Sequence, residues 1–284
     1  MFSRTKKIFG TTLEILIPKD DDFDEDKAAR AVIDVFALFD EFNLIFSRFD
    51  ERSELSHLNL GRRLKVSEPF FELLTFAVNL SKETDGVFNP LVDLSAIGYS
   101  HDFYENNFVK DSDHFSLDID NIVIDNSSPT VELKGNAKID LGGCAKGFTV
   151  DKARKILEKY FRNFLVNAGG DLYASGLFHG EKWQVGIEDP NDFEKDLQVL
   201  DVYDTAVATS GSYRRKWLVD GEKHHHIVSG KNNESVFNDV VAVTVIANTT
   251  LEADVFAKIA FILGQVDGKK FLLNKKVEGF FFCV

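Results

Sequence analysis

The chain is poor in the residues that build disulfide frameworks and flexible linkers. Its 284 residues include two cysteines, Cys144 and Cys283, which excludes a fold held by several disulfides. Five prolines are present, and no repeat, low-complexity tract or Pro-rich linker divides the chain, so we expect a single domain over residues 1–284. No segment has about 18 consecutive apolar residues, and the N-terminus lacks a signal-peptide core. We therefore expect a cytoplasmic protein with no membrane span.

Basic residues are in the minority, with 33 Lys and Arg against 46 Asp and Glu, a formal net charge of −13. Because a nucleic-acid-binding protein needs a basic surface to neutralise phosphates, the charge argues against nucleic acid as a partner. A nucleotide ligand is still compatible with the composition, since backbone N–H groups and a metal ion can bind its phosphates. Hydrophobic content of 44% and charged content of 28% are ordinary for a globular protein.

The hydrophobic pattern predicts more strands than helices. Residues 11–18 alternate as a strand does, whereas residues 28–46 repeat apolar side chains every three or four positions, as an amphipathic helix does. Residues 95–120 lack a clear period and are interpreted as a surface excursion. Because short turns join the strands, we expect an α/β (α+β) fold with a largely antiparallel sheet. Further helices are predicted after Ser67 and over 250–263, and a strand-to-helix unit is predicted over 138–161. Further strands are predicted over 121–126, 130–135 and 163–176, at three places within 182–220, and over 223–230, 239–248 and 279–284.

Two adjacent glycines, Gly142 and Gly143, stand at the predicted turn from a strand into a helix, in the segment DLGGCAKG. Glycines allow a ligand to approach the backbone closely, and the helix start offers unpaired N–H groups to an anion. The segment matches neither the P-loop nor the GxGxxG pattern. A tight turn before a helix, without a ligand, would have the same sequence.

Two other segments carry groups that suit a phosphate. Asn167–Asp171 contains a second glycine pair between apolar runs, and Thr209–Arg215 ends a strand with hydroxyls and two arginines. A hairpin turn and a solvated turn are the respective structural alternatives.

Three consecutive histidines, His224, His225 and His226, open a predicted strand. Alternation places His225 on one face and the other two on the opposite face, so the three cannot converge on one zinc ion. A general base and structural histidines remain as alternatives. Asp254 and Lys258 lie four residues apart on the last helix, which places them on one face and within reach of an ion pair.

In this order, the segments resemble the ApbE family, the FAD:protein FMN transferases. The resemblance runs from residue 9 to residue 258. The matching segments are FGT at 9–11, FSRF at 46–49, SEL at 53–55, LN at 58–59, GVFNP at 86–90, IDLGGCAKGFTVD at 139–151, LVNAGGDLYASG at 165–176, WQVGIEDP at 183–190, VATSGSYRR at 207–215, HHHI at 224–227 and EADVFAK at 252–258.

The resemblance implies a T-fold-like arrangement of antiparallel sheets backed by helices, with FAD bound in a cleft. It also implies a Mg²⁺-assisted reaction in which a Thr or Ser hydroxyl of an acceptor flavoprotein takes FMN from FAD and AMP leaves. His226 would be the base, and the Ala145 carbonyl and the Asp254 carboxylate would bind the metal. The residues implied to line the flavin nucleotide are Gly142, Gly143, Lys146, Gly147, Asp151, Gly169, Gly170, Asp171, Thr209, Ser210 and Tyr213.

The chain departs from the family pattern at two places. Lys258 stands where the family usually has a metal-binding threonine, and Ser229 and Gly230 stand where the family has Asp-Pro after the histidine. An ammonium offers donors and no lone pair, so we expect Lys258 to hold Asp254 and the metal site to be weak or empty. FAD should then bind without added Mg²⁺, and transfer should be slow or absent. Two alternative functions follow: an FAD-binding carrier without turnover, and a pyrophosphatase that converts FAD into FMN and AMP.

Overall fold

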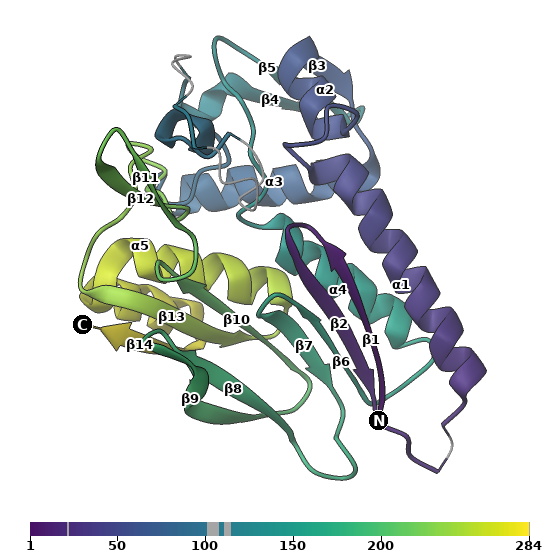
Figure 1. The fold of residues 1–284 in the computed structure, drawn as a ribbon. Helices are drawn as coiled ribbons and strands as arrows, with labels where there is room; N and C mark the ends of the chain where they lie inside the picture. The colour runs from purple at the N-terminus through teal and green to yellow at the C-terminus, as the bar shows by residue number, and fades with distance from the viewer. Residues whose placement is uncertain (22, 101–107, 111–114, 284) are drawn as a thin grey trace.

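A computed structural model describes residues 1–21, 23–100, 108–110 and 115–283. Its centre is a seven-stranded antiparallel sheet with the strand order β1-β2-β6-β7-β10-β13-β14 (Figure 1). The order shows that chain segments far apart in sequence meet in the sheet, as where β2 pairs with β6. The strands are β1 (Phe2–Ile8), β2 (Thr11–Ile17), β6 (Phe164–Ala168), β7 (Asp171–Ser175), β10 (Thr205–Gly211), β13 (Val240–Ala247) and β14 (Glu278–Cys283).

Three helices cover one face of this sheet: α1 (Glu25–Phe46), α4 (Ala145–Leu157) and α5 (Thr250–Lys275). Helix α5 packs on β10 and β13, α4 packs on β6 and β7, and α1 packs on α4. Helix α1 begins at Asp24, whose side chain accepts the Lys27 N–H at 2.9 Å. Carboxylates in its first turn suit the positive end of the helix dipole.

A hairpin of β8 (Trp183–Asp189) and β9 (Asp192–Val202) covers part of the opposite face of the sheet (Figure 1). Trp183 anchors the hairpin, because its indole N–H donates to the Ser175 carbonyl at 3.1 Å. The side chains that share this second core are Leu165, Leu172, Ala174, Trp183, Ile187, Leu200, Val202 and Val207.

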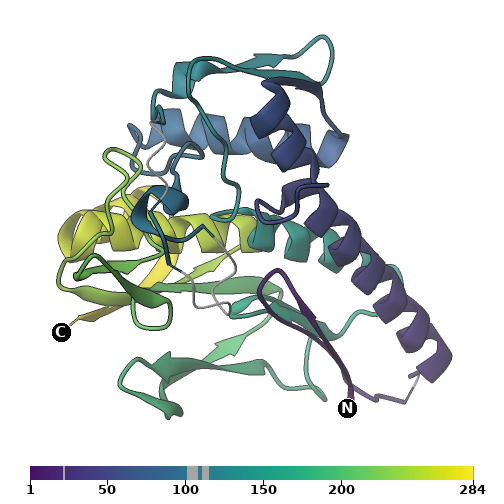
Figure 2. The same cartoon turned by 45° about the horizontal axis from the view of Figure 1, so that its top comes forward.

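A third layer lies beyond the helices, as Figure 2 shows. It contains a small sheet of three strands, in which β5 pairs with both β3 and β4. A separate two-stranded hairpin, β11–β12, carries the first two histidines. The bounds are α2 (Glu54–Gly61), β3 (Arg63–Lys65), α3 (Glu68–Glu83), η1 (Leu94–Ile97), η3 (Ile119–Asn121), β4 (Ile122–Asp125), β5 (Thr130–Leu133), β11 (Lys216–Val219) and β12 (Glu222–His225).

The predicted helix-backed antiparallel sheet is confirmed, but several element boundaries were predicted wrongly. The hydrophobic pattern does not predict β1, because an edge strand rich in exposed Lys and Arg lacks a clean alternation. The eight-residue α2 is likewise not predicted. Residues 163–176, predicted as a strand, form a hairpin, as the alternative for Asn167–Asp171 had it, because Gly169 and Gly170 both have positive φ (67° and 99°) and form the turn.

Other boundaries also differ from the prediction. Residues 182–220 hold four strands instead of three, and residues 138–141 lead into α4 without forming a strand. Helix α5 continues past residue 263 to Lys275, with a break at Gly264 (φ 77°). Within the predicted excursion, η1 is ordered and Tyr99 is buried, while residues 101–107 and 111–114 lie outside the described residues. In the described ranges, no helix combines the length and apolar character needed to cross a bilayer.

Candidate active site

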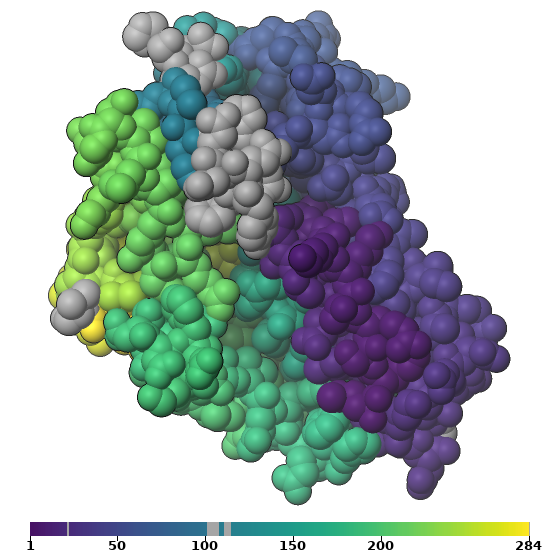
Figure 3. Space-filling model, viewed as in Figure 1, coloured from purple at the N-terminus to yellow at the C-terminus, as the bar shows by residue number. Residues whose placement is uncertain are grey.

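A cavity of about 660 Å³ opens between the N-terminal hairpin and the C-terminal half of the chain. Figure 3 shows this face hollowed between the purple N-terminal segments and the green segments opposite. Its volume is typical of sites for cofactor-sized ligands. The lining residues come from the β1–β2 turn (Phe9, Gly10), α1 and the segment after it (Asn43, Phe46, Ser47, Arg48, Phe49, Asp50, Glu51, Arg52), the segment 87–99 (Val87, Phe88, Asn89, Val92, Leu94, Tyr99), the glycine turn (Asp140, Gly142, Gly143, Ala145, Lys146), and the C-terminal half (Arg215, His226, Val228, Lys258, Ile262).

The glycine turn forms one wall of the cavity. Asp140 accepts the Gly142 N–H at 2.7 Å, which fixes the turn, and helix α4 then begins after Cys144. The Cys144 and Ala145 N–H groups donate to the Leu141 carbonyl, and the Cys144 side chain makes no capping hydrogen bond. Only N–H groups further into the first turn of α4 are therefore left for a ligand. Burial raises the pKa of the Cys144 thiol, which makes it unreactive as a nucleophile.

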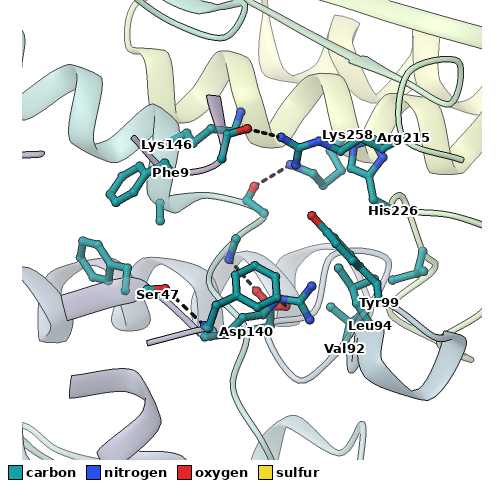
Figure 4. Close-up of a pocket in the computed structure, with 18 of the residues that line it drawn as sticks. Phe9, Ser47, Val92, Leu94, Tyr99, Asp140, Lys146, Arg215, His226 and Lys258 are labelled. Carbon is teal, nitrogen blue, oxygen red and sulfur yellow. Dashed lines mark hydrogen bonds and ion pairs between the residues drawn. The ribbon is translucent and has the colours of Figure 1, made fainter. Parts of the chain in front are cut away.

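Positively charged side chains gather on one side of the cavity. Lys146 and Lys258 project from α4 and α5, and Arg215 comes from the segment after β10, where it also donates to the Gly10 carbonyl at 3.1 Å. Figure 4 shows Lys258 and Arg215 next to His226, Lys146 beside Phe9, and Tyr99, Leu94 and Val92 below His226. Because all three line the same cavity, an anionic ligand bound there would meet several positive charges.

Each lysine in this group is paired with a buried carboxylate. Lys146 contacts Asp171, and Lys258 donates to Asp254 at 2.9 Å. Burial raises the pKa of Asp171 to about 6, against the opposing effect of Lys146. At neutral pH the Asp171 carboxylate is therefore mostly charged, and the Lys146 ammonium pairs with it.

His226 faces the cavity just after β12 ends. Its Nδ1 atom is buried and has no hydrogen-bond partner among the described residues. Burial, with the positive charges of Arg215 and Lys258, holds the pKa of His226 well below its ordinary value of 6.5. The imidazole is therefore neutral at pH 7, with a lone pair available to accept a proton.

The neighbouring histidines have other surroundings than His226. Alternation predicted this for His225 but placed His224 on the face of His226, and it does not hold there because β12 ends at His225. His225 is buried, with its Nε2 atom 2.8 Å from the Val236 carbonyl, and its ring packs edge-on against Phe237. His224 stacks on Trp217 at a ring-centroid distance of 6.2 Å. The three rings thus have three different surroundings.

Arg48 lines a part of the cavity for which the sequence predicted no ligand contact. Its guanidinium lies 4.4 Å from the Phe49 ring centroid and 4.5 Å from that of Tyr99, and its Nε atom is 3.4 Å from Asp140. The planar cation and the two rings form a surface on which an aromatic ligand could stack.

The cavity brings together only part of the predicted flavin set. Gly142, Gly143 and Lys146 line it, as do Ala145, His226 and Lys258 from the predicted metal and base residues. Asp254 lies behind Lys258 and is 3% exposed. The other predicted flavin contacts lie outside the lining: Gly147, Asp151, Gly169, Gly170, Asp171, Thr209, Ser210 and Tyr213.

Several of these residues have other partners. A Cβ on Gly147 would lie 2.6 Å from the Thr250 carbonyl oxygen, so this glycine permits α4 to pass close to α5. Thr209 pairs its hydroxyl with that of Thr244 at 2.8 Å, and Tyr213 packs against Phe193. The predicted contacts of these residues with a flavin remain predictions.

Asp151 serves as an anchor for the start of α5, which gives a stability prediction. Its carboxylate accepts the N–H groups of Thr250 at 2.7 Å and Leu251 at 2.9 Å. Asp151→Ala should therefore lower the free energy of unfolding by about 1–2 kcal/mol, measured by urea denaturation. The exposed Lys155→Ala on the same helix is the control. Unchanged stability with lost flavin affinity would instead favour direct contact between Asp151 and the ligand.

Arg48, Tyr99 and Arg215 line the cavity, although none of the three is among the predicted site residues. Arg215 carries a signal in the sequence, because it ends the segment Thr209–Arg215, where a guanidinium beside hydroxyls suits a phosphate. Arg48 stands in the FSRF segment at 46–49, but its ion pair with Asp140 and its contact with Tyr99 depend on long-range folding.

The residues present do not fit a Mg²⁺ ion. The Lys258 ammonium lies 2.9 Å from Asp254 Oδ1 and 2.6 Å from the Gly143 carbonyl oxygen, so a cation already occupies the space between these oxygens. The carbonyl of Ala145, a predicted ligand, accepts the Thr149 hydroxyl at 2.7 Å. In the described ranges, no three His, Cys, Asp or Glu side chains gather as a metal site would require.

Comparison with known proteins shows which class this fold and cavity define. The chain is 29% identical over 290 residues to the FAD:protein FMN transferase of Treponema pallidum, covering 93% of this chain and 79% of that protein. It is 27% identical to the FAD:protein FMN transferase of Salmonella typhimurium, covering 90% and 80%.

Solved structures give the same class. The crystal structure of the ApbE protein from Thermotoga maritima matches 99% of this chain and 94% of its own, with a TM-score of 0.85 and 27% identity. The flavin transferase ApbE from Vibrio cholerae, at 22% identity and a TM-score of 0.82 over 99% and 93% of the two chains, shares the fold. The ApbE family description matches residues 9–281, so this chain belongs to the ApbE family.

Proposed function

We propose that this protein is an FAD:protein FMN transferase. In the reaction, a Thr or Ser hydroxyl oxygen of an acceptor flavoprotein forms a bond to the FMN phosphorus of FAD. The bond from that phosphorus to the bridging oxygen breaks, AMP leaves, and the hydroxyl proton passes to a base. The observation that carries the proposal is a neutral, unpartnered His226 beside three cations in a cofactor-sized cavity.

His226 is suited to the base because its lone pair is available at neutral pH. The same cations that lower the pKa of His226 attract the pyrophosphate. Once the negative charges of FAD neutralise them, the imidazolium formed by proton transfer becomes less costly. The negative charge of bound FAD thus makes it easier for His226 to accept the hydroxyl proton.

Lys146, Arg215 and Lys258 supply the charge neutralisation that phosphoryl-type transfer needs. The N–H groups at the start of α4 lie at the same wall and can hold non-bridging oxygens. The stacking surface of Arg48, Phe49 and Tyr99 suits an aromatic ring system of the substrate. Although the family resemblance implies Mg²⁺, the Lys258 ammonium lies between the predicted ligand Asp254 and the glycine turn, and no step is assigned to the metal.

Incubation of the full chain with FAD and a flavoprotein domain that carries its flavin on threonine tests this function. We expect flavin fluorescence to stay with the denatured acceptor on a gel, with one AMP released for each flavin attached. FMN and AMP without covalent flavin would replace the proposal by FAD hydrolysis. FAD recovered unchanged, bound one to one, would replace it by a carrier function.

A further inference from the structure

The Lys258 ammonium stands at the centre of a buried charge cluster. It is 2.9 Å from Asp254 Oδ1 and 2.6 Å from the Gly143 carbonyl oxygen. The Asp254 side chain is 4% exposed and that of Lys258 is 18% exposed. Two acceptors from distant parts of the chain, one anionic and one neutral, therefore share one cation.

The charges of the cluster are already balanced. Lys146 neutralises Asp171, and Lys258 neutralises Asp254, with Arg215 as a further positive charge at the same wall. A divalent ion placed here would meet a site with no negative excess. To bind between Asp254 Oδ1 and the Gly143 carbonyl it would have to displace the ammonium. Asp254 Oδ2 is buried without a hydrogen-bond partner in the described part of the chain, but a single carboxylate oxygen beside an ammonium is a poor site for strongly hydrated Mg²⁺, which needs several oxygen ligands.

The Lys258 ammonium also has a third N–H group that can bind a ligand. Of its three N–H groups, two are used by Gly143 and Asp254, and the Lys258 side chain lines the cavity. The third N–H can therefore donate to a phosphate oxygen of a bound nucleotide. In this position the lysine both anchors the wall and supplies positive charge to the ligand.

We infer that Lys258 is the built-in cation of this site: its ammonium takes the place of a divalent metal between Asp254 and the glycine turn, so the protein binds FAD without Mg²⁺. The identity of the ligand rests on the proposed function, whereas the loss of the metal site does not. The inference also implies that FMN transfer proceeds in a chelator.

The test uses the full chain and Mn²⁺ as a paramagnetic probe for the metal site, without flavin. We expect no specific Mn²⁺ binding to the unmodified protein. In Lys258→Thr, which removes the charge and adds an oxygen ligand, Mn²⁺ should bind roughly tenfold tighter or more, because a repelling charge a few ångströms away is gone. Lys258→Met, which has a similar length and no oxygen ligand, should gain less.

FAD affinity gives a second readout, by quenching of flavin fluorescence. The unmodified protein should bind FAD equally in Mg²⁺ and in EDTA. Lys258→Thr should bind more weakly in EDTA and recover in Mg²⁺. Lys270→Thr is the matched control, because Lys270 forms an exposed pair with Asp267 on the same helix and should change neither readout. Thermal unfolding of each variant identifies any that fail to fold.

Tight Mn²⁺ binding to the unmodified protein, or FAD binding that EDTA abolishes, would overturn the inference. Absence of covalent flavin on the acceptor would instead count against the proposed function and leave the Mn²⁺ result standing. The inference about the metal site and the proposed function are thus tested by different measurements.

Discussion

His226→Ala should lower the rate of FMN transfer by roughly 10²–10⁴ while FAD still binds, because a positioned base contributes about that factor. The alanine leaves the cations of the cavity wall in place, so the binding of the pyrophosphate is retained. The measurement is single-turnover labelling of the acceptor, with FAD affinity determined separately by fluorescence quenching.

His224→Ala is the matched control for this prediction. His224 is two residues away, stacks on Trp217 and does not line the cavity, so its loss should leave the rate almost unchanged. His225 is a poor control, since its hydrogen bond to the Val236 carbonyl makes it part of the packing. A slow His224 variant beside a normal His226 variant would show that the base is assigned to the wrong ring.

The pH dependence follows from the lowered pKa of His226. The base works only as the neutral imidazole, and the neutral form predominates above its pKa. Because burial and the nearby cations place that pKa well below 6.5, kcat/KM should stay level as the pH falls through 6.5 and decline only in more acidic solution. A decline centred near 6.5 would indicate a solvated histidine.

The sequence predicted those parts of the site that depend on local spacing. Asp254 and Lys258 were expected to meet because residues four apart share a helix face, and their atoms lie 2.9 Å apart. The glycine turn and His226 were likewise placed by short motifs, and both line the cavity. The sheet was predicted as antiparallel from its short turns, although β1 carried no alternation to reveal it.

Long-range partners could not be predicted in this way. Nothing near Lys258 in the sequence indicates that its second acceptor is Gly143, 115 residues earlier. For Gly147 and Asp151 the motif predicted contacts with a ligand, whereas in the structure Gly147 packs against α5 and Asp151 anchors the start of that helix. A glycine or carboxylate in a motif does not reveal whether a ligand or another helix requires it.

The second large effect is expected at Gly143, where the wall of the cavity has room for one carbon atom and little more. A Cβ there would lie 3.5 Å from Phe88 and 3.7 Å from the Lys258 stem, at ordinary contact distance. Gly143→Ala should therefore fold and bind FAD nearly as well as the unmodified protein. Its φ is not positive, so a side chain brings no backbone strain.

Gly143→Val adds two further methyl groups at the same point, and these must enter the cavity or push Phe88 and Lys258 aside. Overpacking of this kind costs about 1–3 kcal/mol, so FAD affinity should fall by up to roughly a hundredfold. Fluorescence quenching measures the loss, and thermal unfolding shows whether the variant is folded. Because alanine and valine differ only in these methyls, a steep drop between the two variants assigns the effect to steric exclusion at the glycine turn. If the folded valine variant bound FAD undiminished, the nucleotide would have to approach another wall of the cavity, and the glycine turn would have only a structural role.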